Sequence, residues 1–192
     1  MTEICYIDDI IYQKDTVLTV GTFDGIHQGH LSLMKRLVQK AKQHTCRSVV
    51  VSFDPHPRSI IHAGDDGIKL LTTLEERSRH LSEIGVDVLC VIPFTRDFSL
   101  QNSEEFVTNI LSAKIGLSYF IIGYDHHFGK NRDGNAQTLQ KMAPHLNFEV
   151  CNAQVSLRLR LCGPSDKSLR EVCPHQLPNR VRRDPPQFAP RM

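Results

Sequence analysis

The chain has 192 residues and a net charge of +2, with 40% hydrophobic and 23% charged residues, which is the composition of a globular domain. No apolar run reaches the roughly 18 residues that a membrane span needs, and the acidic stretch MTEICYIDDIIYQKD lacks the basic start of a secretory signal. These features argue against a membrane or secreted protein and predict a cytoplasmic one, whose six cysteines are reduced thiols.

Charge is divided unevenly along the chain. Residues 1–150 contain 15 Lys or Arg and 18 Asp or Glu, whereas residues 151–192 contain 8 and 3. Six of the ten prolines also lie in residues 151–192. We therefore expect a folded domain over 1–150 and, over 151–192, an Arg/Pro-rich tail that is disordered or altered by a lost reading frame.

The first half of the domain predicts strands alternating with helices. The β-branched run TVLTVG (16–21) predicts a buried strand, and apolar residues at helical spacing predict a helix over 28–44. SVVVSF (48–53) predicts the second strand, which ends at DPHP. Thr73 and Glu76 have capping-box spacing, so a second helix is expected from there to Ile84.

The same alternation continues in the second half. VDVLCVI (86–92) predicts a third strand, and Ser103 is expected to cap a helix that ends before Gly116. SYFIIG (118–123) predicts a fourth strand, a helix is expected from about Asn135 to Ala143, and NFEV begins a fifth strand. This order predicts an α/β fold, a doubly wound parallel sheet with helices on both faces.

Three chemically rich loops follow strands one, two and four of this predicted sheet. They are GTFDGIHQGH, DPHPR and GYDHHFG. Ligands of open parallel sheets bind beyond the carboxyl ends of the strands, so these loops are expected to converge on one site.

The first loop suits an anion. Gly21 and Gly25 permit a sharp turn, and Gly29 permits close approach to a helix whose N–H groups and dipole attract negative charge. His27 and His30 are three residues apart, so both rings project to one side of the first helical turn, where they can donate to phosphate oxygens.

The residues of this loop also allow other interpretations. Asp24 can orient a histidine or help to hold a metal ion on bound phosphates. A zinc site lacks further ligands at suitable spacing, a Walker loop lacks its Lys-Ser or Lys-Thr, and the glycine spacing does not match a dinucleotide fingerprint. The remaining alternative is a turn whose histidines merely cap the helix.

With its companions, the loop resembles a known family. GTFDGIHQGH is similar to the signature of the HxGH nucleotidyltransferases. SVVVSFDPHPR, LLTTLEERSRHLSEIGVDVLCVIPF and FIIGYDHHFGKNRDG extend the likeness to the adenylyltransferase module of prokaryotic bifunctional FAD synthetases, over about residues 15–150. The resemblance implies a Rossmann-like fold of the HxGH type.

The resemblance also implies a reaction, in which AMP passes from ATP to FMN to give FAD and pyrophosphate. It implies ATP and FMN as substrates and Mg²⁺ that enters with ATP, with no metal ligand assigned to the protein; membrane partners are not expected and nucleic acid is disfavoured. The implied catalytic residues are Asp24, His27 and His30. The implied ATP-binding residues are Gly21, Thr22, Phe23, Asp24, Gly25, His27, Gly29 and His30.

The second and fourth loops are implied to hold FMN. The residues carried over are Pro55, His56, Pro57, Arg58, Asp125, Phe128 and Gly129. Arg58 can form a forked contact with a phosphate, unless it is only a solvated loop residue. Phe128 stands among polar residues, so we expect it to be exposed and able to stack on the flavin, with Asp125 accepting a ring N–H.

Two departures from the family pattern matter. A chain of this length has no room for a riboflavin kinase module, so riboflavin phosphorylation is not expected. The superfamily's Ser-Ser-Thr-x-x-Arg motif is also missing after NFEV, where CNAQVSLRLRLCGPSDKSLREVCPH stands instead. Three functions remain open: a working or impaired FMN adenylyltransferase, a non-catalytic relic that binds nucleotide or flavin, and an RNA-binding tail. A metal tract formed by Cys151, Cys162 and Cys173 matches no known ligand spacing.

Overall fold

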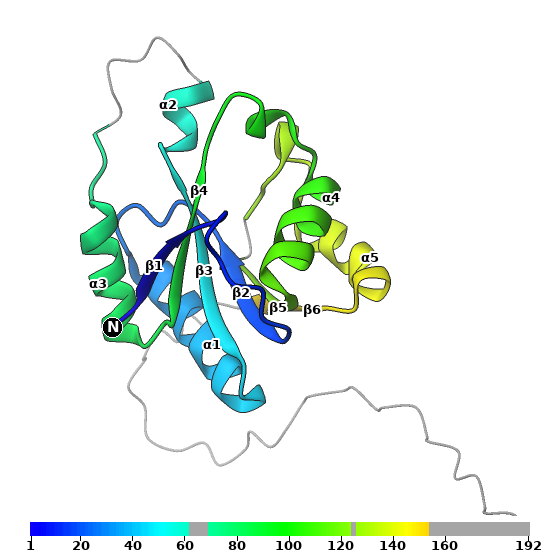
Figure 1. The fold of residues 1–192 in the computed structure, drawn as a ribbon, viewed down its shortest axis with the longest axis horizontal. Coiled ribbons are helices and arrows are strands. Elements are labelled where there is room, and N and C mark those ends of the chain that lie inside the picture. The colour runs from blue at the N-terminus through cyan, green and yellow to red at the C-terminus, as the bar shows by residue number, and fades with distance from the viewer. Residues whose placement is uncertain (62–68, 124–125, 154–192) are drawn as a thin grey trace, which may run out of the picture. The chain divides into compact units, whose positions relative to one another are not determined.

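The structure, a computed structural model, describes residues 1–61, 69–123 and 126–153. Its strands form one six-stranded, fully parallel sheet in the order β1-β4-β3-β2-β5-β6 (Figure 1). The strands are β1 (Glu3–Tyr6), β2 (Thr16–Val20), β3 (Arg47–Asp54), β4 (Val88–Pro93), β5 (Leu117–Gly123) and β6 (Glu149–Ala153). The predicted α/β parallel sheet is confirmed.

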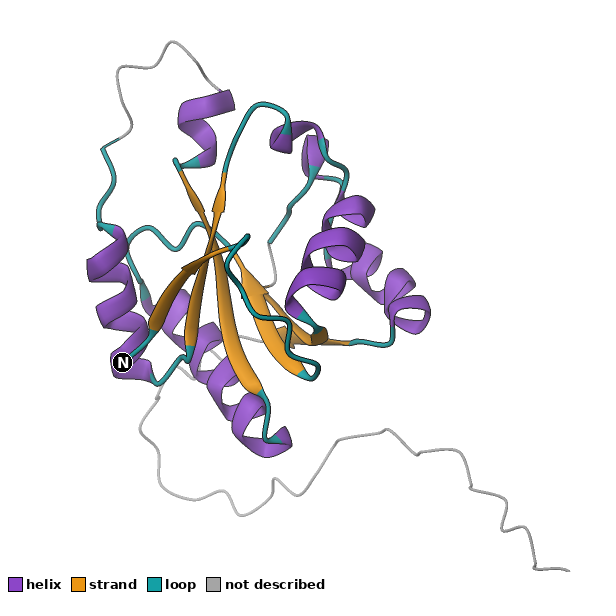
Figure 2. Ribbon diagram, viewed as in Figure 1, coloured by secondary structure: helices purple, strands orange, loops and turns teal. Residues whose placement is uncertain are grey.

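Helices cover both faces of the sheet (Figure 2). The α-helices are α1 (Gln28–His44), α2 (Pro57–Ile61), α3 (Leu74–Ile84), α4 (Ser103–Glu105) and α5 (Ala136–Leu146). The other helical segments are the 3-10 turns η1 (Phe98–Leu100) and η3 (Lys130–Arg132) and the π-helix η2 (Phe106–Ile115), into which α4 continues directly. None of the helices in the described ranges is long and apolar enough to cross a membrane.

The two faces have separate hydrophobic cores because side chains alternate along each strand. Val17 and Val50 pack with α1 and α3, whereas Leu18 and Val51 pack with η2 and α5. All four side chains are fully buried. Because the sheet is buried on both faces, the sequences of its central strands are continuous apolar runs.

Several predicted boundaries differ from the structure. The edge strand β1 was not predicted, and neither was α2 after DPHP. Asn102, not Ser103, caps α4, because the Asn102 side chain accepts from the Glu105 N–H at 2.8 Å, leaving Ser103 as the first helical residue. α5 runs through Pro144 to Leu146, and β6 continues past the boundary expected at residue 150. The division into a domain and a tail stays a prediction, because residues 154–192 lie outside the described residues.

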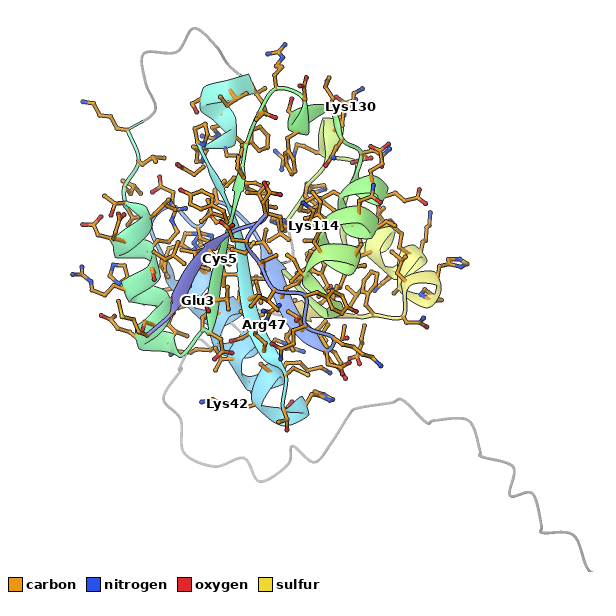
Figure 3. All side chains as sticks on the ribbon, in the orientation of Figure 1. Glu3, Cys5, Lys42, Arg47, Lys114 and Lys130 are labelled. Carbon is orange, nitrogen blue, oxygen red and sulfur yellow. The ribbon has the colours of Figure 1, made fainter. Side chains whose placement is uncertain are left out.

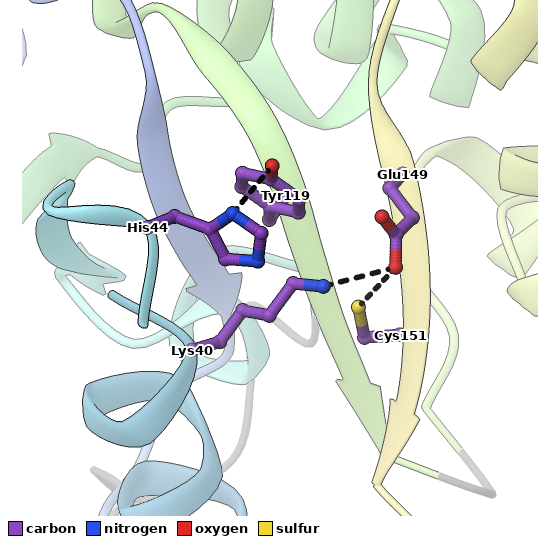
Figure 4. A network of polar contacts seen from close by, with 5 residues as sticks. All are labelled: Lys40, His44, Tyr119, Glu149 and Cys151. Carbon is purple, nitrogen blue, oxygen red and sulfur yellow. Dashed lines mark hydrogen bonds and ion pairs between the residues drawn. The ribbon is translucent and has the colours of Figure 1, made fainter. Parts of the chain in front are cut away.

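A polar network ties the carboxyl end of α1 to β5 and β6 (Figure 4). Lys40 Nζ lies 3.0 Å from Glu149 Oε1 and 4.5 Å from the centre of the Tyr119 ring. Tyr119 Oη lies 3.1 Å from His44 Nδ1, and the Cys151 thiol donates to Glu149. These contacts hold one end of α1 against the sheet and so help to fix where its other end lies.

Candidate functional site

The candidate site lies where the chain connections change direction across the sheet. From β2 the chain moves through α1 to β3 on one side, and after β4 it crosses to β5 on the other side of β2. The carboxyl ends of β2 and β5 therefore diverge into loops that flank an opening, the usual ligand position in open parallel sheets.

One cavity of about 680 Å³ joins the three predicted loops. Its wall includes Gly21, Thr22, Phe23 and His30 from the first loop, His56, Pro57 and Arg58 from the second, and His126, His127, Phe128 and Gly129 from the third. The predicted convergence is therefore present in the structure. Among the described residues, Asp24, Gly25, His27, Gly29 and Pro55 belong to these loops but not to the cavity wall.

The α1 amino terminus is capped by an imidazole. Nδ1 of His27 accepts from the N–H groups of Gly29, at 3.1 Å, and His30, at 3.4 Å. A neutral His27 whose Nδ1 accepts these hydrogen bonds carries its proton on Nε2. Its Nε2–H can therefore act as a hydrogen-bond donor. No acidic residue occupies the first turn of α1, so the positive end of the helix is not neutralised by a carboxylate of its own.

His30 lies against His27 and faces the cavity. The two rings are stacked with centroids 3.7 Å apart. His30 Nδ1 lies 3.3 Å from the Gly25 carbonyl, and its ring meets the edge of Phe23 at 5.2 Å. Burial, and then the neighbouring His27, lower the pKa of His30. An arriving polyanion would reverse this effect, because negative charge favours the protonated ring.

Phe23 supports the loop from inside. Its side chain is buried and belongs to the core between the sheet and α1. Its backbone has φ of +48°, a left-handed conformation that is uncommon for an aromatic residue and stays in place only when the surroundings hold it. A side chain on Gly21 would collide with the Phe23 ring, so glycine is required there. The ring of Phe23 thus packs against the His30 ring, and Phe23 also belongs to the cavity wall.

Asp24 is engaged by the segment that leads into α3. Its Oδ1 accepts from the N–H groups of Leu71, at 2.8 Å, and Thr72, at 3.0 Å, and from the Thr72 hydroxyl. Burial opposes ionisation, but these hydrogen bonds outweigh it and lower the pKa of Asp24. The carboxylate fastens the first loop to the start of α3.

The second loop turns directly into α2. Nδ1 of His56 accepts from the Arg58 N–H at 3.2 Å, so His56 closes the start of that short helix, and Pro57 occupies its first position. Burial lowers the pKa of His56, with Asp24 opposing this shift. Arg58 is exposed and reaches the cavity wall.

The expected exposure of Phe128 is wrong. Its side chain is 8% exposed and packs between Phe120, at 5.9 Å, and Phe106, at 6.0 Å. Phe128 also forms a two-residue bridge with Gly134, where any side chain would collide with the ring. This bridge turns the ring inward, so Phe128 borders the cavity as a largely buried residue. Asp125 lies outside the described residues.

Sequence reasoning missed the aromatic wall of the cavity. Phe53 lies near the carboxyl end of β3, and Phe94 and Phe98 follow the end of β4. The three rings contact one another with centroid distances of 5.4–5.9 Å. The loop after β4 obeys the same carboxyl-end rule as the others, which was the available signal. Lys130 and Arg132 add positive charge to this wall. Figure 3 shows Lys130 at the carboxyl end of the strands, whereas Arg47 lies at the amino end of β3.

The half-buried His126 belongs to the same cavity wall. Burial, and then the neighbouring His127, Arg132 and His30, lower the pKa of His126 to about 4, so its ring is neutral near pH 7. Within the described ranges, no group of three His, Cys, Asp or Glu side chains is placed to hold a metal ion. The cavity therefore combines an apolar aromatic wall, basic side chains and a helix amino terminus, a combination that suits a flat aromatic ligand bearing phosphate.

Comparison with known proteins agrees with this chemistry. A family model described as FAD synthetase matches residues 9–158. A bifunctional riboflavin kinase/FMN adenylyltransferase of Escherichia coli K12 is 32% identical over 142 residues, which cover 74% of this chain and 45% of that protein. The protein of the same description from Listeria monocytogenes is 35% identical over 134 residues, covering 70% of this chain and 42% of that one. The chain thus spans less than half the length of these relatives.

A solved structure supports the fold. A crystal structure described as a macrolide-efflux protein from Streptococcus pneumoniae aligns with a TM-score of 0.67 at 24% identity. The alignment covers 79% of this chain and 51% of that one. At this identity the likeness concerns the arrangement of strands and helices.

Proposed function

The chain belongs to the FAD synthetase family, and from that membership we propose that it transfers the AMP group of ATP to FMN, giving FAD and pyrophosphate. The observation that carries the proposal is the convergence of three loops on one cavity next to the α1 amino terminus. A nucleotide and a flavin phosphate must meet in one place, and this cavity offers cationic groups beside apolar rings.

ATP is assigned to the first loop. Gly21, Thr22 and Phe23 would line the nucleotide with backbone groups, and His27 and His30 would contact its phosphates. Gly25 and Gly29 would act through the shape of the turn. Asp24 would act by fastening the loop to Leu71 and Thr72 rather than by touching ATP.

FMN is assigned to the second and fourth loops. Arg58 would meet the FMN phosphate, with Pro55, His56 and Pro57 shaping the loop that presents it. Phe128 and Gly129 would border the isoalloxazine ring, with Asp125 as the expected acceptor of a ring N–H. The aromatic wall of Phe53, Phe94 and Phe98 offers the apolar surface that such a ring needs.

The reaction needs no protein nucleophile. An oxygen of the FMN phosphate attacks the α-phosphorus of ATP, and the bond from that phosphorus to the bridging α–β oxygen breaks, so pyrophosphate leaves with the electron pair. The protein acts by positioning and by stabilising the charge that develops on the leaving group. Nε2 of His27 would donate at neutral pH, and His30 would donate once the bound phosphates have raised its pKa.

We infer that a divalent cation, Mg²⁺ by chemical preference, enters with ATP. The described residues offer no cluster of metal ligands, and three hydrogen bonds already engage Asp24 Oδ1, so the site fits an ion held by substrate phosphates and water. Such an ion would neutralise part of the triphosphate charge. His27 and His30 would then orient the phosphates and the ion that they carry.

FAD formation tests the proposal. Purified chain with ATP, FMN and Mg²⁺ should produce FAD and pyrophosphate, and His30→Ala should reduce kcat/KM by about 100-fold. His80→Ala on α3 is the matched control and should leave the rate unchanged. Binding of both substrates without formation of FAD would instead support a non-catalytic binding module. The absence of the Ser-Ser-Thr-x-x-Arg motif after NFEV is the reason for testing this alternative. Absence of both binding and turnover would refute the assignment.

A further inference from the structure

A buried arginine outside the cavity wall connects α3 to the first loop. Arg77 is 3% exposed, and its Nε has no hydrogen-bond partner among the described residues. No Asp or Glu of the described ranges lies within ion-pair distance of it. Burial lowers the pKa of Arg77 and outweighs the carboxylates of Asp24 and Asp54, which attract its charge from beyond contact distance. Removing a guanidinium from water with no carboxylate in contact costs free energy, and hydrophobic packing does not require it. A positioning function would account for this charge.

The contacts of Arg77 lead in one direction. Its Nη1 donates to Ser52 Oγ at 2.9 Å, and Ser52 Oγ lies 3.1 Å from the Thr22 carbonyl oxygen. A guanidinium cannot accept a hydrogen bond, so the single Ser52 hydroxyl proton has to be donated to Thr22. A bond to a charged donor also polarises the hydroxyl and strengthens the next bond. Arg77 therefore fixes a carbonyl of the first loop through one intermediary.

That carbonyl belongs to a strained part of the loop. Thr22 immediately precedes Phe23, whose φ is +48° and whose ring meets the edge of the His30 ring. A backbone in this conformation relaxes unless it is held on both sides. Phe23 is held by its buried ring on one side and by the Thr22 carbonyl on the other.

We propose that Arg77 is a positioning residue for the ATP subsite, acting through Ser52 and Thr22 to hold Phe23 and, through it, the His30 ring. The proposal rests on the assignment of ATP to the first loop. It also explains the use of arginine inside a largely apolar layer between α3 and the sheet. Asp24 adds a second connection from the same direction, because Leu71 and Thr72 immediately precede the start of α3.

Four variants separate positioning from simple folding. Arg77→Met keeps much of the volume without the charge, and Arg77→Lys keeps the charge with fewer donors. Ser52→Ala removes the intermediary alone. Arg79→Met is the matched control, because Arg79 is an exposed arginine on the same helix. Thermal unfolding of each protein shows whether it is folded at the assay temperature.

Two readouts then decide. Calorimetry should show ATP affinity lowered by about 10-fold in Arg77→Met and Ser52→Ala, with FMN affinity within about twofold of the parent. The double variant with Arg77→Met and Ser52→Ala should bind ATP no more weakly than the weaker-binding of the two single variants. Both substitutions break the same connection, so their effects should not add. Arg77→Lys should recover part of the loss, and Arg79→Met should lose nothing.

The second readout does not depend on any substrate. In the ligand-free protein, amide hydrogen exchange should rise about 10-fold in peptides covering residues 21–30 of Arg77→Met and stay unchanged in β4. Unchanged exchange in the first loop overturns the proposal even if ATP does not bind the parent chain. Equal losses of ATP affinity, FMN affinity and thermal stability also overturn it, since they would mean a general folding role. Loosened exchange without ATP binding in the parent would retain the positioning of the loop and reject its assignment to ATP.

Discussion

The amino termini of α1 and α3 are capped by different means. α3 begins with a complete capping box, in which Thr73 accepts from the Glu76 N–H and Glu76 accepts from the Thr73 N–H, and it has two acidic residues in its first turn. α1 begins with the His27 imidazole and has no acidic residue there. α3 thus neutralises its own positive end, whereas no acidic residue in the first turn of α1 neutralises the positive end of that helix.

This difference separates two properties of a helix amino terminus, its contribution to stability and its capacity to bind an anion. A carboxylate in the first turn stabilises a helix by up to about 1 kcal/mol, so its absence from α1 forgoes stability. An imidazole cap satisfies backbone donors and still keeps its second nitrogen for another group. The proposed function predicts that the two termini respond differently to equivalent changes.

The largest effect is expected from His27→Asn. Asparagine is among the best helix caps, so α1 should stay intact, but the second ring nitrogen is lost. We expect kcat/KM for FAD formation to fall about 100-fold, with the unfolding temperature changed by less than about 3 °C. Full activity in this variant would mean that His27 serves only as a cap, the alternative raised by the sequence. Thr73→Asn, the equivalent exchange on α3, is the control and should leave activity unchanged.

A charge exchange between the two termini should have the next largest effect. Gln28→Glu gives α1 the acidic first turn that α3 has, so it should stabilise the ligand-free protein slightly and repel the triphosphate. We expect ATP affinity to fall roughly 10-fold by calorimetry. Glu75→Gln makes the reverse change in α3 and should cost about 0.5 kcal/mol of stability without affecting ATP. A stronger response to Glu75→Gln than to Gln28→Glu would contradict the assignment of ATP to α1.

Proton linkage gives a smaller effect. Burial and His27 hold the pKa of His30 below 6.5 in the free protein. The phosphates of ATP, bound as proposed, would raise it. The complex therefore binds more protons, so ATP affinity should rise several-fold as the pH falls from 8 to 6 and stop rising below the free-state pKa. ATP itself titrates in this range, so the measurement is the difference between the parent and His30→Gln. Equal pH slopes in both proteins would exclude His30 as the linked group.

The fold could be predicted because its central strands carry a strong signal. Buried β-branched runs ending in glycine or polar residues gave the positions of β2 and β3 to within a residue. The edge strand β1 has exposed or half-buried side chains and no apolar alternation, so it resembles a loop in sequence. Its pairing with β4 becomes visible only in the assembled sheet.

The site was only partly predictable for a related reason. Sequence placed His27 and His30 at the start of a helix, but the stacking of their rings depends on the conformation of residues 23–27. The polar neighbours of Phe128 suggested exposure, whereas its bridge to Gly134 turns the ring inward. Arg77 gave no signal at all, because a charged residue on an amphipathic helix is ordinarily solvated.

The smallest effect, and the sharpest test of the comparison, comes from Thr73→Ala. Losing the cap should cost about 1 kcal/mol, which for a domain of this size lowers the unfolding temperature by roughly 2–4 °C. ATP affinity should change by less than about threefold, because the hydrogen bonds to Asp24 of the first loop come from the neighbouring Leu71 and Thr72, which the substitution leaves in place. Thr73→Ser should restore the stability. If Thr73→Ala weakened ATP binding as much as Gln28→Glu, the α3 terminus would belong to the nucleotide site itself. Its capping box and acidic first turn would then no longer distinguish it from α1 in function.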